Sequence, residues 1–238
     1  QDLWSVIETP PDGTTLHLAD GSTLEVDAIV VSVGRVPFTD GLLADGTAVQ
    51  IGDRGFVEVD ASCRTAEPGV YAVGDVIATP ALAHVGFAEG MLAIRDLLGE
   101  APTPIDYDRV PWCIYCHPEV AFAGYSEEAA REAGLEVVVS KHRYLGNGRA
   151  MILGDNQGMV KVIAEKRPDG SAGRLLGVHM VGPWVTEQLG QAYLAVNWEA
   201  TPEEIAAFIQ PHPTLSALFR EAVLALTGRS LHACLRSP

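Results

Sequence analysis

The sequence predicts an α+β fold in which an antiparallel sheet is flanked by helices, and three observations support this prediction. Beyond about residue 108, short apolar runs of strand length are separated by turn residues, with Pro168-Asp169-Gly170 as the clearest hairpin turn. After residue 185, apolar residues recur instead at the 3.6-residue spacing of amphipathic helices. Runs of strands that are segregated from runs of helices are typical of α+β domains. The 238 residues are 47% hydrophobic and 20% charged, a composition that can bury a core.

The N-terminal quarter of the chain predicts β-structure. Asp12-Gly13 separates two β-like runs, and Asp20-Gly21 has the sequence of a hairpin turn. An almost continuous apolar run over residues 27–35 predicts a buried strand, whereas the alternation over residues 55–60 predicts a strand half exposed to water. The strands expected here are residues 14–18, 23–26, 27–35 and 55–60.

The next stretch predicts a turn, a short strand and a helix. Pro68-Gly69 predicts the turn, and the unbroken apolar run 70–73 predicts a strand buried on both faces. Gly74-Asp75 follows, and we expect a helix from about residue 83 to residue 98, with Gly99 as its stop. Gly74 lets a ligand approach the backbone, and the Asp75 carboxylate lies where open α/β sheets bind ligands. Free N–H groups at the helix start add positive potential beside it.

We expect a domain boundary near residue 107, because three prolines between residues 102 and 111 interrupt regular structure. The residues beyond it form a compact unit. Ser126 and Thr201 are predicted helix caps, the second through a capping box with Glu204. Strands are expected at residues 120–124, 136–143, 150–153, 158–164 and 174–181, and helices at 126–134, after Thr201, and at 185–196 and 215–226.

The overall charge and the hydropathy pattern argue against several classes of partner. The formal net charge of −15 disfavours nucleic acid and anionic membrane surfaces, since both require clustered cationic groups. No run approaches the roughly eighteen apolar residues of a transmembrane helix, and the chain has no basic-then-apolar start like that of a signal peptide. The four cysteines are too few for a secreted disulfide scaffold of this size. We therefore expect no nucleic acid, no membrane and a cytoplasmic location.

One stretch carries a specific pattern: Arg64-Thr65-Ala66-Glu67-Pro68-Gly69-Val70-Tyr71-Ala72-Val73-Gly74-Asp75, followed by Leu82-Ala83-His84. It resembles the second flavin-contacting motif of the class I pyridine nucleotide–disulfide oxidoreductases, and within them it is most similar to the dihydrolipoamide dehydrogenases. The resemblance implies that Asp75, beside Gly74, bonds the ribityl chain of FAD. It also implies that the helix start at Leu82, Ala83 and His84 touches the flavin ring. The alternative is that Asp75 only caps the approach to the helix.

Other parts of the chain resemble the same family. Gly34-Arg35-Val36-Pro37 is similar to the end of its NAD-binding domain. Four stretches are similar to its C-terminal interface domain, namely residues 116–121, 147–150, 176–179 and 210–216. The resemblance implies three parts: a remnant of the NAD-binding domain (1–35), the C-terminal part of the FAD-binding and central domains (36–107), and the dimerisation domain (108–238).

The remaining cofactor motifs of the family do not occur in these residues. The sequence contains no G-x-G-x-x-G and no two cysteines with a four-residue spacer. In the family, glycine-rich loops bind FAD and NAD, and a Cys-x4-Cys pair is redox-active. The sequence therefore resembles the C-terminal half of such an enzyme, and we expect these residues alone to be inactive.

His212 is the candidate catalytic residue. Pro211 and Pro213 restrict the backbone on both sides, so we expect the imidazole on a rigid loop at a helix start. Imidazole exchanges protons near neutral pH. The resemblance implies that His212 takes a proton from the dithiol of the partner subunit, since only a thiolate attacks a disulfide or flavin competently. The alternative is a histidine that bonds carbonyl groups within a turn.

Position 217 departs from the family pattern. Dihydrolipoamide dehydrogenases have a glutamate five residues after this histidine, where it orients the imidazole, but this chain has Ala217. Glu221 lies about 6 Å further along the expected helix and is interpreted as a poor substitute. In triad-type sites, the loss of such an orienting partner lowers kcat by orders of magnitude. The disulfide substrate is therefore left open.

A C-x2-C-H pattern occurs at Cys113-Ile114-Tyr115-Cys116-His117. This spacing is shared by c-type haem attachment sites, thioredoxin-like pairs and zinc half-sites, but zinc needs two further ligands, and Cys63 and Cys234 are isolated. Both cysteines are interpreted as small buried apolar residues, with redox sensitivity as the alternative, and no metal site is expected. Three further side chains are interpreted as packing groups: His84, His117 and His179.

The resemblance implies the C-terminal part of a homodimeric, FAD-dependent dithiol/disulfide oxidoreductase that oxidises a dihydrolipoyl group and reduces NAD. It also implies a further partner, the lipoyl-bearing acyltransferase of a 2-oxo acid dehydrogenase complex. Whether the nucleotide is NAD or NADP stays open. The alternatives are a dimerisation module without turnover and a related flavin disulfide reductase with another substrate.

Overall fold

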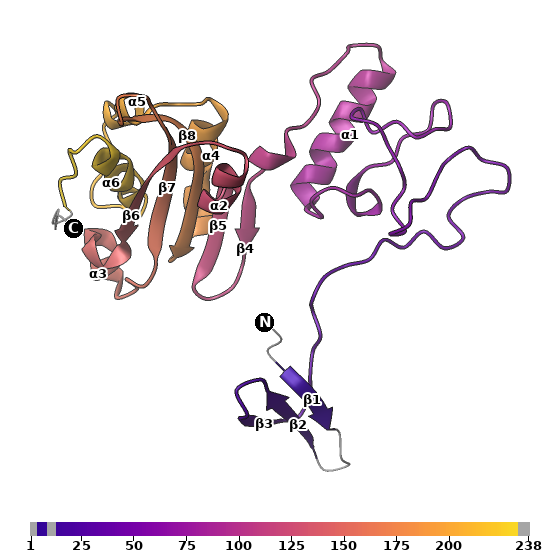
Figure 1. Ribbon diagram of the computed structural model, residues 1–238, viewed down its shortest axis with the longest axis horizontal. Helices are drawn as coiled ribbons and strands as arrows, with labels where there is room; N and C mark the ends of the chain where they lie inside the picture. The colour runs from indigo at the N-terminus through magenta and orange to yellow at the C-terminus, as the bar shows by residue number, and fades with distance from the viewer. Residues whose placement is uncertain (1–3, 9–12, 233–238) are drawn as a thin grey trace.

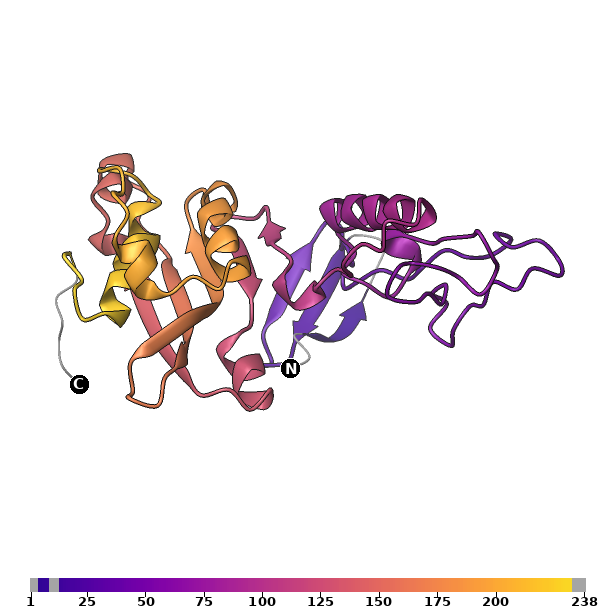
Figure 2. The same ribbon diagram turned by 90° about the horizontal axis from the view of Figure 1, so that it is seen from above.

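The computed structural model describes residues 4–8 and 13–232, which form three parts strung along the chain (Figures 1 and 2). A three-stranded sheet comes first, and a long extended segment leads from it to a part built around one helix. A five-stranded sheet with its helices forms the C-terminal part. The buried apolar residues form separate clusters in the second and third parts, so each of these parts has a core of its own.

The N-terminal sheet consists of β1 (Trp4–Glu8), β2 (Thr14–Leu18) and β3 (Thr23–Val26), which are antiparallel and adjacent in that order. The hairpin predicted at Asp20-Gly21 is confirmed. Gly21 has φ +86°, a conformation that glycine adopts without strain, and its N–H donates to the carbonyl of Leu18 at 3.0 Å. For the other predicted turn, Asp12 lies outside the described residues.

The strand predicted at residues 27–35 is wrong. These residues form no regular element, and the side chains of Val30, Val31 and Val33 are 89%, 70% and 90% exposed. A strand is stable only where a neighbour satisfies its N–H and C=O groups. Among the residues described by the structure, none forms a strand beside this segment, so its apolar side chains face solvent along the connection that leaves β3 in Figure 1.

The second part is organised by α1 (Ala83–Leu97), which confirms the predicted helix, and Gly99 follows it with φ +78°. The strands predicted at residues 55–60 and 70–73 are wrong. These residues make only isolated bridges, such as Val57 with Ile77 and Arg64 with Tyr71. Val70 is 41% exposed and is therefore not buried on both faces. The small core of this part consists of Val57, Cys63, Ile77, Leu92 and Ala93.

The C-terminal part is built on an antiparallel sheet with the strand order β4-β5-β8-β7-β6. Its strands are β4 (Trp112–Ile114), β5 (Glu119–Gly124), β6 (Val137–Arg143), β7 (Met159–Lys166) and β8 (Ala172–Gly182). The predicted α+β architecture is confirmed. The turn predicted at Pro168-Asp169-Gly170 joins β7 to β8, and Gly170 has φ +84° there.

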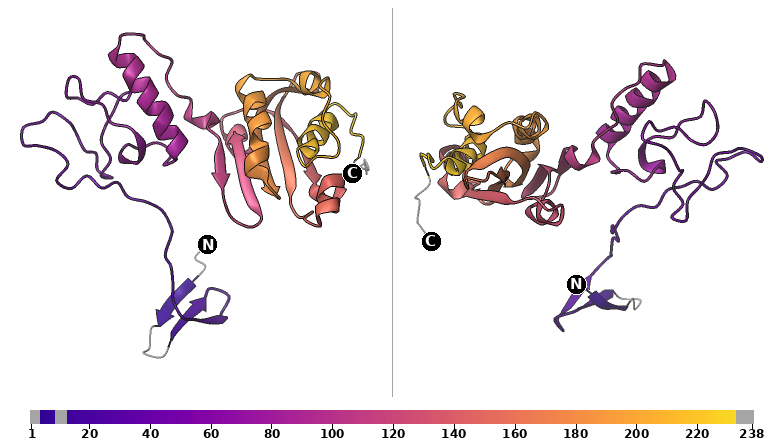
Figure 3. Two further views of the ribbon diagram at one scale, coloured as in Figure 1. Left: turned by 180° about the vertical axis from the view of Figure 1, so that it is seen from behind. Right: turned by 45° about the horizontal axis from the view of Figure 1, so that its top comes forward.

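Helices cover both faces of this sheet. They are α2 (Glu127–Glu132), α4 (Val185–Asn197), α5 (Pro202–Ala206) and α6 (Ala217–Leu226). Along β7, Val160 and Val162 pack in the cluster formed with α4 and α6, whereas Ile163 packs on the opposite face against Ala130 of α2. Figure 3 shows α1 standing apart from this layered unit. Of the helices that the structure describes, none has the length and apolar composition needed to cross a bilayer.

The strand predicted at residues 150–153 is wrong, because these residues form α3 (Gly148–Leu153). The Asn147 side chain accepts a hydrogen bond from the N–H of Ala150 and so caps the helix, and Gly154 ends it with φ +72°. The caps predicted at Ser126 and Thr201 are confirmed, the latter with the full capping box to Glu204.

Candidate functional site

The candidate cofactor residues lie at one end of α1. Gly74 begins a short 3-10 turn, η1 (Gly74–Val76), and has φ +75°. A Cβ built on Gly86 of α1 would lie 3.4 Å from the Cα of Gly74, so the first turns of the helix pack closely against this turn. The cap position of α1 is Leu82, which provides no side-chain hydrogen bond to the helix start. The amides of Ala83 and His84 therefore point out of an uncapped N-terminus.

A buried carboxylate that the sequence did not single out fixes the η1 turn. Glu89 of α1 is fully buried, and its carboxylate accepts hydrogen bonds from the N–H of Gly74 at 2.6 Å and from the hydroxyl of Tyr107 at 3.0 Å. Burial, together with the hydrogen bond to Glu89, raises the pKa of Tyr107, so its phenol stays protonated and donates. Glu89 thus ties η1 to both α1 and η2 (Tyr107–Arg109).

Asp75 presents its carboxylate at the surface, where it forms an ion pair with Arg35. The two side chains are 54% and 68% exposed, and Nη1 of Arg35 lies 2.7 Å from Oδ2 of Asp75. The same guanidinium donates to the carbonyl of Ala81 at 3.2 Å. Arg35 therefore spans the gap between η1 and the loop that leads into α1. An exposed pair of this kind is weak in water, so the Asp75 carboxylate is available to a competing hydroxyl donor.

His212 lies on an exposed loop before α6, as the flanking prolines predicted. The loop is braced by hydrogen bonds among its own residues: the Thr214 hydroxyl donates to the carbonyl of Pro211 at 2.8 Å and accepts from the N–H of Ala217 at 3.2 Å. The amide of Asn147 donates to the carbonyl of Thr214 at 3.0 Å, so the cap of α3 also fastens this loop. The imidazole is presented to solvent on a rigid support.

The imidazole of His212 stacks on a second histidine. The rings of His212 and His232 are parallel within 4°, with centroids 5.6 Å apart. Glu221, a buried residue of α6, holds the segment that carries His232, because its carboxylate accepts from Ser230 and from the N–H of Leu231. Burial alone would raise the pKa of Glu221, but its hydrogen bonds, those from His232 first, hold the pKa below its ordinary value.

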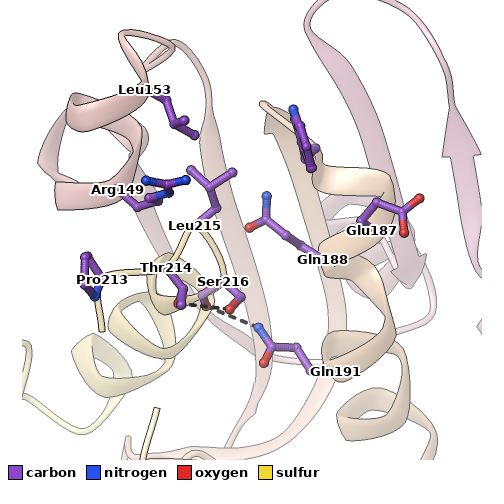
Figure 4. A pocket seen from close by; sticks show the side chains of 10 residues that line it. Arg149, Leu153, Glu187, Gln188, Gln191, Pro213, Thr214, Leu215 and Ser216 are labelled. Carbon is purple, nitrogen blue, oxygen red and sulfur yellow. Dashed lines mark hydrogen bonds between the residues drawn. The ribbon is translucent and has the colours of Figure 1, made fainter. Parts of the chain in front are cut away.

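A cleft of about 480 Å³ opens beside the His212 loop, between α3 and α4. Figure 4 shows its lining, in which Arg149 and Leu153 of α3 lie on one side, Gln188 of α4 lies on the other, and Leu215 lies between them. Its floor is fixed by Gln191, whose amide donates to the carbonyl of Ser216 at 3.2 Å. None of these residues was singled out by the sequence as a site residue.

The two cysteines of the C-x2-C-H pattern lie in different environments. Cys113 is half buried in β4 and burial raises the pKa of its thiol, in keeping with a packing role. The interpretation of Cys116 as buried is wrong: this residue is exposed, since it follows β4 at the sheet edge, and its Sγ lies 3.1 Å from the carbonyl of Pro118. Cys234 lies outside the described residues. In the ranges that the structure covers, no three His, Cys, Asp or Glu side chains are grouped to hold a metal ion.

Two family models match the chain. Residues 5–90 match the model described as pyridine nucleotide-disulphide oxidoreductase, and residues 110–223 match the dimerisation domain of the pyridine nucleotide-disulphide oxidoreductases. The first match contains the Gly74-Asp75 turn and the start of α1, and the second contains His212.

The chain belongs to the pyridine nucleotide-disulphide oxidoreductase family. Its curated relatives include the dihydrolipoyl dehydrogenase of Cupriavidus necator, which is 38% identical over 230 residues, 95% of this chain and 48% of that protein. The mitochondrial dihydrolipoyl dehydrogenase of Caenorhabditis elegans is 42% identical over 85% of this chain and 40% of its own length. The chain thus spans about half the length of these relatives. They confirm the resemblance to dihydrolipoamide dehydrogenases.

Solved structures of this family share the fold. LpdA from Mycobacterium tuberculosis superposes with a TM-score of 0.81 at 27% identity, over 94% of this chain and 48% of that one. The flavoprotein disulfide reductase RclA from Escherichia coli also gives a TM-score of 0.81, over 92% of this chain and 50% of its own, at 23% identity, and that likeness concerns the fold alone.

The structure brings together five of the six predicted site residues of this family member and leaves the sixth apart. Gly74, Asp75 and the start of α1 lie at one end of that helix. His212 lies in the C-terminal part, in the loop before α6, and Figure 1 places α1 and α6 at opposite sides of the five-stranded sheet. One chain therefore does not unite the two groups of residues in a single site.

Proposed function

We propose that this chain is the C-terminal part of a homodimeric, FAD-dependent dithiol/disulfide oxidoreductase that resembles dihydrolipoamide dehydrogenase. The observation that carries the proposal is the identity of 38% over 95% of the chain with a dihydrolipoyl dehydrogenase, a match that includes both groups of candidate residues. In this proposal, residues 1–35 end the NAD-binding domain, residues 36–107 end the FAD-binding and central domains, and residues 108–238 form the dimerisation domain.

The residues at the start of α1 fit a cofactor such as FAD. Asp75 offers an exposed carboxylate that can accept hydrogen bonds from ribityl hydroxyls, and Gly74 leaves the backbone beside it unobstructed by a side chain. The amides at Leu82, Ala83 and His84 form an uncapped helix start with positive potential. When bound, FAD supplies the two-electron acceptor between the dithiol and NAD.

His212 is the proposed acid/base group, and it acts on the partner subunit. Its loop is exposed and rigid, and the candidate cofactor residues of the same chain lie in another part of the molecule. A second copy must therefore bring the two together. There the imidazole would take a proton from the dithiol at the partner subunit and so leave a thiolate, the form that attacks a disulfide or flavin.

Turnover assays test the proposal. We expect the complete protein to form NADH from dihydrolipoamide and NAD⁺, and the 238-residue chain alone to form none, because it has neither a G-x-G-x-x-G loop nor a Cys-x4-Cys pair. The variant His212→Gln of the complete protein should lose about 10²- to 10⁴-fold in kcat with its flavin content unchanged. NADH formation by the 238-residue chain would contradict the assignment, and so would full activity of the His212→Gln protein.

Ala217 favours a second candidate, a related flavin disulfide reductase with another substrate, since this position offers no carboxylate to the His212 loop. A panel of disulfides and dithiols assayed with the complete protein decides between the two. The lipoyl-bearing acyltransferase remains a proposed partner, to be tested by co-purification. A cytoplasmic location also remains a prediction, and some of the relatives are mitochondrial.

A further inference from the structure

We propose that Glu221 and His232 form a positioning pair that holds the imidazole of His212. This inference deepens the proposed function. The predicted effect on turnover rests on the proposed catalytic role of His212. The geometry on which it is based, an anchored imidazole stacked on an exposed one, belongs to this chain whatever reaction the complete protein catalyses.

Glu221 anchors the returning C-terminal segment at several points. After α6, Gly228 turns the chain with φ +71°, and the next residues fold back over the helix. Oε2 of Glu221 then accepts hydrogen bonds from the hydroxyl of Ser230 at 2.9 Å and from the N–H groups of Leu231 and His232 at 2.9 and 3.0 Å. Its side chain is only 8% exposed, so water competes weakly for these bonds.

The same carboxylate orients the ring of His232. Oε1 of Glu221 lies 3.2 Å from Nδ1 of His232, so the backbone and the side chain of this histidine are held by the two oxygens of one carboxylate. Because the backbone N–H and the ring Nδ1 of His232 are both held, the ring presents a defined face. Ser230 adds a further link, because its hydroxyl lies 3.3 Å from Nε2 of His142 in β6. The segment is thereby tied to the sheet as well as to α6.

His212 lies against that face. The two rings are parallel within 4° at a centroid separation of 5.6 Å, an offset-stacked arrangement. On the α3 side, a Cβ built on Gly148 would lie 4.0 Å from Cε1 of His212, so that backbone also approaches the imidazole. The residue five positions after His212 is Ala217, whose methyl group cannot bond the ring. Glu221 is too far along α6 to do so itself, and His232 spans the gap.

Nuclear magnetic resonance of the 238-residue chain, with ¹³C-labelled histidines, tests the contact without any need for activity. We expect Overhauser effects between the ring protons of His212 and His232, and ring-current displacement of the His212 signals. His232→Ala should abolish both, His232→Phe should keep the displacement because a phenyl ring can stack, and Glu221→Gln should weaken the Overhauser effects. His17→Ala, in the separate N-terminal sheet, is the matched control and should change nothing at His212.

The outcome that overturns the proposal is a His212 spectrum that is the same in the parent chain and in His232→Ala. His232→Ala is less prone to unfold than Glu221→Gln, because His232 is half exposed and its loss leaves the core intact, whereas Glu221 is buried. Thermal unfolding of each variant shows whether it is folded.

Kinetics of the complete protein then test the consequence. His232→Ala should lower kcat about tenfold, with KM and flavin content unchanged, and His232→Phe should restore part of the loss. Equal kcat values for the parent and His232→Ala, or equal losses for both variants, would overturn the positioning role. If His212→Gln itself retains full turnover, the proposed function of His212 fails, while the spectroscopic result still decides whether the pair holds the ring.

Discussion

Glu89 is the residue on which the conformation of the η1 turn depends most. Replacing it with leucine would leave the N–H of Gly74 and the hydroxyl of Tyr107 buried without an acceptor. We expect Glu89→Leu to lower the free energy of unfolding by about 2–5 kcal/mol, since each unsatisfied buried group costs about 1–3 kcal/mol. Urea denaturation measures this loss. Glu58→Gln, an exposed glutamate in the same part, is the control and should stay within about 0.5 kcal/mol of the parent.

Two glycines in the part built around α1 should respond to alanine in opposite directions. Gly74 has φ +75° with free space around its missing Cβ, so Gly74→Ala should destabilise by about 1–2 kcal/mol through backbone strain alone. Gly90 lies within α1, also with open space around it, and Gly90→Ala should stabilise by about 0.5–1 kcal/mol. Urea denaturation compares the two variants with the parent. If both variants change the free energy of unfolding in the same direction, η1 does not hold Gly74 in this conformation.

At the level of elements, α3 and the His212 loop share one side chain. Asn147 caps α3 through the N–H of Ala150 and donates to the carbonyl of Thr214. Asn147→Ala should cost about 2–3 kcal/mol, because it removes a cap worth about 1 kcal/mol and leaves a carbonyl without its donor. Ser126→Ala removes only a cap and should cost about 1 kcal/mol. If the two variants lose equal stability in urea denaturation, the link from α3 to the loop contributes nothing.

The docking of α2 on the sheet should depend on acid pH. Hydrogen bonds from Lys161 in β7 and from Arg131 lower the pKa of Glu127 from 4.5 to about 2. Because the folded state has the lower pKa, the stability contributed by Glu127 is full above pH 4.5, declines as the pH falls, and is lost below about 2. The stability difference between the parent and Glu127→Gln, measured by urea denaturation, should therefore shrink between pH 6 and pH 3. A constant difference would contradict this role.

Elements set by local chemistry could be predicted from sequence, and elements set by distant neighbours could not. The Asp20-Gly21 turn, the Thr201 capping box and the Gly99 stop of α1 each depend on a few adjacent residues, and all three are confirmed. The run at 27–35 has the composition of a buried strand but no neighbour to pair with. The helix α3 is an exception, because its start depends on the adjacent Asn147 cap, whereas the apolar run at residues 150–153 taken alone has the composition of a strand.

The candidate site follows the same division. His212 and the residues at the start of α1 could be found from sequence because the motifs around them are contiguous. Glu89, Arg35 and His232 could not, because each acts through contacts that span 15 to 40 residues of the chain or through ring stacking across a loop. Arg35 lies in the Gly34-Arg35-Val36-Pro37 stretch, but that pattern does not reveal its ion pair with Asp75. No residue pattern distinguishes Glu89 or His232 from ordinary helix or surface residues.

On the scale of the whole molecule, the three parts should differ in local stability. One apolar face of α1 is exposed to solvent, at Phe87, Met91 and Ile94. The valines of the segment after β3 are also exposed. The central strands β7 and β8 are instead buried between helices. Hydrogen exchange of the 238-residue chain should therefore be fast in residues 13–107 and slow in residues 108–232. Equal protection of both ranges would contradict this expectation.

The central claim is that His212 of one subunit serves the dithiol chemistry of the other, and complementation in mixed dimers tests it most directly. The complete protein is prepared as two inactive variants, His212→Gln and a variant without the redox-active cysteine pair expected in its N-terminal half. In the mixed dimer, one site combines the intact imidazole of one subunit with the intact cysteines of the other. We expect co-expression of the two variants to restore NADH formation from the dithiol. A mixture of confirmed heterodimers that stays as inactive as its parents would contradict it.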